Sequence, residues 1–102
     1  MTDFAHLHLH TTYSFLDGMV RPRELGKRCA ELGMSSCAVT DHRHMGSALS
    51  VYANLKSAGV KPILGMELDV KPTHGGKGVH HLIVLARTNE GYNNLRARTI
   101  RW

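Results

Sequence analysis

The sequence lacks a long hydrophobic run and has few cysteines and aromatic residues. Its 102 residues include 2 cysteines, 3 prolines and 6% aromatic residues. No apolar stretch approaches the roughly 20 residues that a membrane-spanning helix needs. No basic segment followed by an apolar one opens the chain, as it would in a secretion signal. We therefore expect no spanning or targeting segment, no membrane partner and a cytoplasmic location.

The two cysteines do not form a Cys-x-x-Cys motif. Cys29 and Cys37 both fall in apolar segments, where a small buried thiol is the usual occupant. We expect both to be reduced residues of the core.

Acidic residues are also few, because 8 Asp and Glu stand against 13 Lys and Arg, giving a formal net charge of +5. The basic residues are scattered up to Arg87 and then cluster at Arg96, Arg98 and Arg101. A mildly basic surface is compatible with nucleic acid without indicating it. With 42% hydrophobic and 21% charged residues, the chain fits one small domain with a modest core.

Strand-like and helix-like segments alternate along the chain. Short apolar runs predict strands at residues 5–9, 36–40, 61–70 and 79–86. Helical spacing predicts helices at residues 22–33 and 46–59, the first with proline at its start, and both with glycine at the carboxyl end. A third helix is predicted to begin at residue 89. This order predicts an α/β fold with right-handed crossovers and a largely parallel sheet.

The last two predicted strands are separated by a glycine-rich connection at residues 74–78. If they form a hairpin that is symmetric about this connection, His81 lies beside Glu67. The alternation of the third strand also places Glu67 and Asp69 on the same face.

The first predicted strand carries a metal-site pattern. Alternate side chains of a strand point to opposite faces, so His6, His8 and His10 would line one side and Leu7 and Leu9 the other. Three imidazoles placed together are costly to bury or protonate, unless a cation or a carboxylate uses their lone pairs. A solvated histidine-rich terminus stays open as the alternative.

Other ligand-type side chains fall at the carboxyl ends of the strands, where reactive groups gather in barrels and open sheets. Asp17 lies in the loop after the first strand, His42 follows the second, and Glu67 lies at the end of the third. We expect them at one edge of the sheet, with the histidines of the first strand. A turn at Asp17, a helix cap at Asp41 and a lysine partner for Glu67 stay open.

A series of motifs in this order closely resembles the polymerase and histidinol phosphatase (PHP) domain. They are His8-Leu9-His10-Thr11, Tyr13-Ser14, Leu16-Asp17-Gly18, Thr40-Asp41-His42, Lys61-Pro62-Ile63-Leu64-Gly65-Met66-Glu67, His81-Leu82-Ile83-Val84-Leu85-Ala86 and Glu90-Gly91-Tyr92-Asn93-Asn94-Leu95. They are most similar to the version at the start of the alpha subunit of bacterial DNA polymerase III. The resemblance covers nearly the whole chain.

The resemblance implies the amino-terminal part of a distorted, TIM-like β/α barrel. Such barrels hold up to three metal ions, usually zinc, manganese or iron, on as many as nine ligands. Six positions match those ligands: His8, His10, Asp17, His42, Glu67 and His81. The remaining three ligands would lie beyond residue 102. Thr40 and Asp41 are expected behind His42, where they would hold its ring in one tautomer.

The chain departs from the family in two places. The family's second motif usually continues Asp-His-Gly-Asn, whereas this chain has Arg43 and His44, which puts a bulky cation next to the expected site. His44 is then either an extra ligand or an exposed loop histidine. Residues 1–95 correspond to a partial PHP domain, and residues 96–102 form a basic tail without a match. A truncated or frame-shifted gene product would explain this ending.

The resemblance implies a piece of a replicative DNA polymerase with a partial phosphoesterase or 3′–5′ exonuclease-type site. The polymerase palm does not fit in 102 residues, and no catalytic residue is expected apart from the metal ligands. DNA and other replicase subunits are the implied partners of the full-length protein. A free-standing phosphoesterase and a non-catalytic metal-binding fragment stay open, although residues 90–95 favour the polymerase branch.

Overall fold

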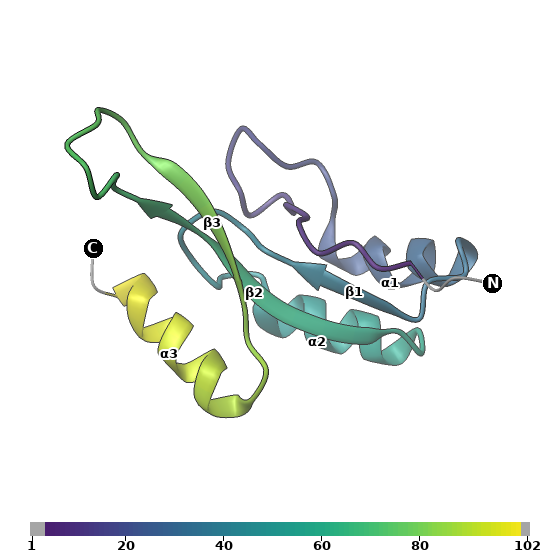
Figure 1. The fold of residues 1–102 in the computed structure, drawn as a ribbon. Helices are drawn as coiled ribbons and strands as arrows, with labels where there is room; N and C mark the ends of the chain where they lie inside the picture. Colours follow the sequence, from purple (N-terminus) through teal and green to yellow (C-terminus); the bar gives the residue numbers. More distant parts are fainter. Residues whose placement is uncertain (1–3, 101–102) are drawn as a thin grey trace.

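The computed structural model describes residues 4–100, and the side chains of residues 4–97. Its elements are α1 (Pro22–Glu31), β1 (Ser36–Val39), α2 (Ala48–Ser57), β2 (Lys61–Val70), β3 (His80–Leu85) and α3 (Asn89–Ile100). The strands form one sheet in the order β1-β2-β3. Helices α1 and α2 lie along β1 and β2, whereas α3 follows β3 and contacts β2 (Figure 1).

The sheet confirms the predicted α/β fold and the predicted hairpin. Strands β1 and β2 are parallel, with Ser36 opposite Lys61. Strands β2 and β3 are antiparallel, with Glu67 opposite Ile83 and Asp69 opposite His81. The sheet of the described residues is therefore mixed rather than largely parallel, because the glycine-rich connection returns the chain directly beside β2.

The core lies between β1 and the first two helices. Its buried residues are Leu25, Cys29, Cys37, Val39, Val51, Leu55 and Val60. Both cysteines are free and buried, as predicted. Burial and the neighbouring Cys29 raise the pKa of the Cys37 thiol to about 12, so this thiol stays protonated at neutral pH.

The prediction of a regular strand at residues 5–9 is wrong, although the path of this segment is close to the expected one. Its carbonyls accept hydrogen bonds from β1 and the residue after it, Ala38 N to His6 O at 2.8 Å and Thr40 N to Leu9 O at 2.8 Å. The backbone bends at Leu7 and His8, which breaks the alternation of faces. The side chains of this segment therefore do not alternate between two faces as predicted.

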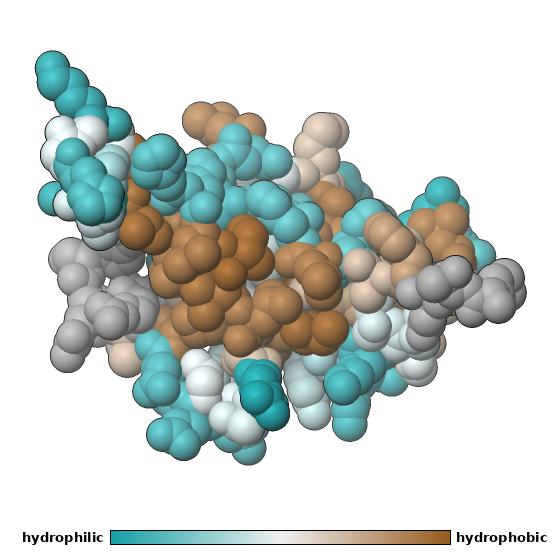
Figure 2. Space-filling view, viewed as in Figure 1, coloured by the Kyte–Doolittle hydropathy of each residue, from teal (hydrophilic) through white to brown (hydrophobic). Residues whose placement is uncertain are grey.

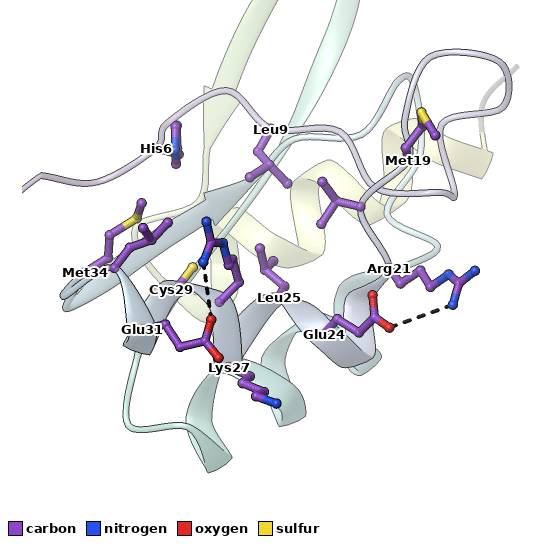
Figure 3. Close-up of a pocket in the computed structure, with 13 residues that line it drawn as sticks. His6, Leu9, Met19, Arg21, Glu24, Leu25, Lys27, Cys29, Glu31 and Met34 are labelled. Atoms are coloured by element: carbon purple, nitrogen blue, oxygen red, sulfur yellow. Dashed lines mark hydrogen bonds and ion pairs between the residues drawn. The ribbon is translucent and has the colours of Figure 1, made fainter.

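His6 shows the consequence of this bend. It lies over α1 and lines a cavity of about 520 Å³ together with Leu9, Leu25 and Cys29 (Figure 3). The prediction that His6 shares a face with His8 and His10, opposite Leu9, is therefore wrong.

Several large hydrophobic side chains remain exposed, among them Phe15, Leu16, Leu49 and Leu82. Figure 2 shows hydrophobic side chains gathered in the middle of the face on which β3 lies. None of the described helices is long and apolar enough to cross a membrane.

The last helix continues past the boundary predicted at residue 95. Leu95 is buried, and α3 runs on to Ile100. The predicted basic tail at residues 96–102 thus begins inside this helix, while Arg101 and Trp102 lie outside the described residues. The division of the chain at residue 95 stays a prediction.

Candidate metal centre

The centre is assembled where the segment after β1 meets β2. His42 pairs with Glu67 in a parallel bridge. Glu67 N donates to Asp41 O at 3.0 Å, and Arg43 N donates to Glu67 O at 2.9 Å. These bonds fix the backbone at the carboxyl end of β1 against β2. Glu67 lies inside β2 rather than at its end, because the strand continues to Val70 in order to pair with β3.

One group of possible metal ligands consists of His8, His10 and Glu67. His8 Nε2 lies 2.5 Å from Glu67 Oε2 and 3.2 Å from His10 Nε2. His10 Nε2 lies 3.3 Å from the same carboxylate oxygen. The two imidazoles and the carboxylate therefore converge on one point, as the sequence predicts for the motif His8-Leu9-His10.

A second group consists of His42, Glu67 and His81. His42 Nδ1 lies 2.7 Å from Glu67 Oε1, and His81 Nδ1 lies 3.3 Å from it. Glu67 is thus shared, with Oε2 facing the first group and Oε1 facing the second. In each group the ligand atoms lie within 4.8 Å of one another. The hairpin brings His81 to Glu67 diagonally, since Asp69 is the residue directly opposite His81.

The Glu67 carboxylate is almost completely buried, with 2% of its side chain exposed. Burial raises its pKa, but the hydrogen bond from His10, the charge of His42 and the hydrogen bond from His8 together outweigh burial. The pKa of Glu67 therefore lies below its ordinary value, and the group is an anion at neutral pH. A buried anion among imidazoles is suited to a bound cation.

Two buried atoms at the junction of the groups test whether a metal ion fits. Among the described side chains, His42 Nδ1 and Glu67 Oε1 are buried without a hydrogen-bond partner. They are 2.7 Å apart, but their mutual orientation is not that of a hydrogen bond. Such atoms are costly unless something binds them. Two lone-pair donors that face one space fit a metal ion.

Asp17 is brought to the centre by a tight turn. Leu16 adopts a left-handed backbone with φ 71°, and a Cβ on Gly18 would lie 2.0 Å from Thr11 O. Asp17 Oδ2 lies 2.7 Å from His42 Nε2. We assign a proton of this contact to Nε2, which makes Nδ1 the nitrogen of His42 that is available to a metal ion beside Glu67. Asp17 lies outside both groups, and its role as a ligand stays a prediction.

Ser14 orients the ring of His10 as Asp17 orients the ring of His42. This role of Ser14 was not predicted from the sequence. The Ser14 hydroxyl donates to Asp41 Oδ1 at 2.7 Å and accepts from His42 N at 3.0 Å. Its contact with His10 Nδ1 at 2.8 Å must therefore carry the proton on the imidazole. With Nδ1 protonated in this way, Nε2 is the nitrogen of His10 that could exchange its proton for a metal ion beside Glu67. Ser14 belongs to the motif Tyr13-Ser14, which was the available signal.

Asp41 is the buried hub behind the centre. It accepts hydrogen bonds from Thr11 N, Thr11 Oγ1, Ser14 Oγ and Ser47 Oγ at 2.6 to 2.8 Å. Burial raises its pKa, but these hydrogen bonds outweigh burial, and the pKa of Asp41 lies below its ordinary value. Asp41 is therefore an ionised residue that ties three segments together.

The role predicted for Thr40 and Asp41 differs from the contacts observed. Both were expected to hold the His42 ring, yet that ring is oriented by Asp17. Thr40 Oγ1 instead accepts from Leu9 N at 3.1 Å, which fixes the segment between His8 and His10. Thr40 and Asp41 lie behind the ligands as expected, but they support the amino-terminal side of the centre.

Two further side chains, His44 and Asp69, lie at the rim of the centre. His44 accepts from Gly46 N with Nδ1 at 3.0 Å, so its Nε2 donates to Tyr13 O at 2.9 Å. Both nitrogens hold the loop, which favours a loop histidine over an extra ligand. Asp69 Oδ1 lies 3.5 Å from His81 Nε2, and Asp69 Oδ2 lies 3.2 Å from an Arg43 guanidinium nitrogen.

Comparison with known proteins shows which sequences this chain resembles. The DNA polymerase III subunit alpha of Helicobacter pylori (strain ATCC 700392 / 26695) is 46% identical over 97 residues, 90% of this chain. The chain spans 8% of the length of that relative. This similarity confirms the predicted likeness to polymerase III alpha subunits.

Two solved structures have a fold similar to that of this chain. An amidohydrolase from Chromobacterium violaceum, solved with bound sulfate and no metal, gives a TM-score of 0.70 at 25% identity, covering 91% of this chain and 32% of that one. A protein from Bifidobacterium adolescentis assigned as a metal-dependent phosphoesterase gives 0.71 at 20% identity, covering 95% and 32%. The expected fold, the amino-terminal part of a distorted β/α barrel, is confirmed.

The family model described as PHP domain matches residues 6–98. This match includes all six predicted ligand positions, from His8 to His81. The chain therefore belongs to the PHP domain family.

Proposed function

We propose that this chain binds two divalent metal ions, one in each ligand group, with Glu67 shared between them. The observation that carries the proposal is the buried Glu67 carboxylate, whose two oxygens face different pairs of histidines. The imidazoles suit zinc or iron better than magnesium or calcium, and the carboxylates suit manganese as well. Asp17 completes the proposed set next to His42.

We propose further that the centre serves the hydrolysis of phosphoesters. Ions held there would supply Lewis acidity and would lower the pKa of water. Ser14 and Asp17 hold protons on the outer nitrogens of His10 and His42, so the inner nitrogens are available to the ions. The assigned phosphoesterase among the structures with a similar fold supports this chemistry.

The likeness to polymerase III alpha subunits supports a nucleic acid as the natural substrate. We propose that the phosphodiester of DNA is cleaved in a 3′–5′ exonuclease-type reaction, within a replicase that supplies the other subunits. Polymerisation itself is assigned to parts of such a protein that this chain does not include.

Calorimetry with zinc and with manganese tests metal binding. The natural chain should bind two ions. His10→Ala should lose at least about a hundredfold in metal affinity, because changing even a residue that only orients a ligand can reduce metal affinity by up to about a hundredfold. His74→Ala is the matched control, because His74 is exposed in the turn between β2 and β3. Equal heats from the natural chain and His10→Ala would refute the site.

Hydrolysis of bis(4-nitrophenyl) phosphate tests the chemistry. We expect slow, metal-dependent release of nitrophenol that disappears in His10→Ala and persists in His74→Ala. Release that is independent of metal, or equal in both variants, would contradict the proposed reaction.

A further inference from the structure

A second feature of the centre is the cavity that opens beside it. The cavity has a volume of about 460 Å³ and includes the predicted ligands Asp17 and His42 in its wall. Tyr13, Phe15 and Arg43 form other parts of the wall. A molecule in this cavity therefore lies next to the metal centre, between aromatic side chains and a cation.

The backbone of Arg43 is unusual for a residue with a Cβ. Its φ is 60°, in the left-handed region that favours glycine. The hydrogen bond from Arg43 N to Glu67 O, at 2.9 Å, holds it there. Backbone strain of this kind persists where the surroundings over-determine the conformation, and it is common at functional sites. The position is therefore fixed, although a residue with a Cβ is disfavoured in this conformation.

The guanidinium of Arg43 is directed to the rim of the second ligand group. It lies 3.2 Å from Asp69, which also faces His81. The Arg43 side chain is 53% exposed, so much of it remains accessible from solvent. An exposed ion pair of this type is weak and exchanges readily for another anion.

We propose that Arg43 is a substrate-positioning residue, whose guanidinium binds the phosphate of a phosphoester held in the adjoining cavity. This inference rests on the proposed phosphoester chemistry. A guanidinium is planar and donates two parallel hydrogen bonds to a phosphate, which fixes the orientation of the group as well as its place. Asp69 holds the guanidinium at the rim until the phosphate replaces it.

The alternative is a purely structural role, in which Arg43 only restrains Asp69 and thereby His81. The two roles differ in what they predict for metal binding. A structural role makes zinc affinity depend on Arg43. A positioning role makes phosphate affinity depend on it and leaves zinc affinity unchanged.

The test is calorimetric titration of inorganic phosphate into the zinc-loaded chain, with Arg43→Gly and Arg43→Lys as variants. Glycine suits the backbone at this position, so Arg43→Gly should fold at least as well as the natural chain, which thermal unfolding checks. We expect phosphate affinity to fall about tenfold in Arg43→Gly and by less in Arg43→Lys, which keeps the charge but loses the planar fork. Zinc affinity should change by less than about twofold in both.

Asp69→Asn supplies a matched control, because it removes the ion pair between Asp69 and the guanidinium. Its phosphate affinity should equal or exceed that of the natural chain. Equal phosphate affinity in the natural chain and Arg43→Gly would overturn the proposal, as would a parallel loss of zinc and phosphate binding. Failure of the natural chain to bind zinc would instead refute the proposed function, and the phosphate titration of the metal-free chains would then decide the role of Arg43.

Discussion

The two ligand groups share Glu67 but are supported in different ways. On the amino-terminal side, His10 is 16% exposed and is held by Ser14 and the buried Asp41. On the hairpin side, His81 is 51% exposed and faces Asp69, which pairs with Arg43 at the surface. His10 is thus organised by buried hydrogen bonds and His81 by exposed ion pairs, whereas of the other two histidines His8 is 54% and His42 is 17% exposed.

This difference follows from where each half lies in the fold. The first half rests on the packed region around β1, where Thr11, Ser14, Asp41 and Ser47 are all buried. His81 of the second half belongs to the β2–β3 hairpin, which projects from the rest of the molecule (Figure 1). Buried hydrogen bonds are strong and insensitive to salt, whereas exposed ion pairs are weak and screened. We therefore expect changes to the buried support of His10 to have larger effects than changes to the exposed pairs around His81.

The largest effect is expected from Asp41→Asn. An amide has one acceptor oxygen and an NH2 group, which would face the donors Ser47 or Thr11 that the carboxylate now satisfies. Each buried donor left without an acceptor costs about 1–3 kcal/mol, and the carboxylate now serves several of them. Urea unfolding of the metal-free chain measures this loss. A change below about 1 kcal/mol would show that the hub contributes little.

This hub could not be predicted from the sequence. Asp41 directly precedes a predicted ligand, and a helix cap or an outer residue behind His42 were the available interpretations. Its partners come from two other parts of the chain, around residues 11–14 and at Ser47. Only the tertiary structure places them around one carboxylate, because no local pattern relates hydroxyls so far apart in sequence.

Other parts of the fold were predictable because local rules determine them. The strands β1, β2 and β3 match their predicted ranges within one residue at each end. The hairpin follows from the glycine-rich connection, which also brought His81 near Glu67 as expected. The first segment was mispredicted because alternation assumes a straight strand, and the bend at Leu7 and His8 turns His6 away. The ligands still converge, because the segment after β1 pairs with Glu67 and the hairpin brings His81 to it.

The next largest effect is expected from Gly18→Ala, on the packed side of the comparison. The added Cβ would lie 2.0 Å from Thr11 O, a backbone atom that cannot move without disturbing the turn that carries Asp17. Overpacking of this kind costs about 1–3 kcal/mol. Gly76→Ala in the hairpin is the control, since its nearest neighbour, Pro72, would be at an ordinary 3.5 Å. Equal unfolding midpoints for the two variants would remove this contrast between the regions.

Ser14→Ala should reduce metal affinity more than Asp69→Asn on the hairpin side. The variant removes the acceptor that keeps the His10 proton on Nδ1, and it also removes a donor to Asp41. Loss of such a partner weakens metal binding about 10- to 100-fold. Zinc calorimetry measures the change, with Ser50→Ala on the exposed side of α2 as the matched control. Similar affinities for the two variants would mean that Ser14 does not orient His10.

The smallest effect is expected from Asp69→Asn, on the hairpin side. The contact of Asp69 with His81 is long, at 3.5 Å, and half of the His81 side chain is exposed. Exposed pairs contribute about 0.2–1 kcal/mol, so zinc affinity should fall by no more than about fivefold. Because salt at about 1 M shortens the Debye length to about 3 Å, the natural chain and Asp69→Asn should then bind zinc equally. The corresponding loss in Ser14→Ala should persist at that salt concentration, since its hydrogen bonds are buried. If Asp69→Asn instead lost as much affinity as Ser14→Ala, and lost it at every salt concentration, the two halves of the centre would be supported in the same way.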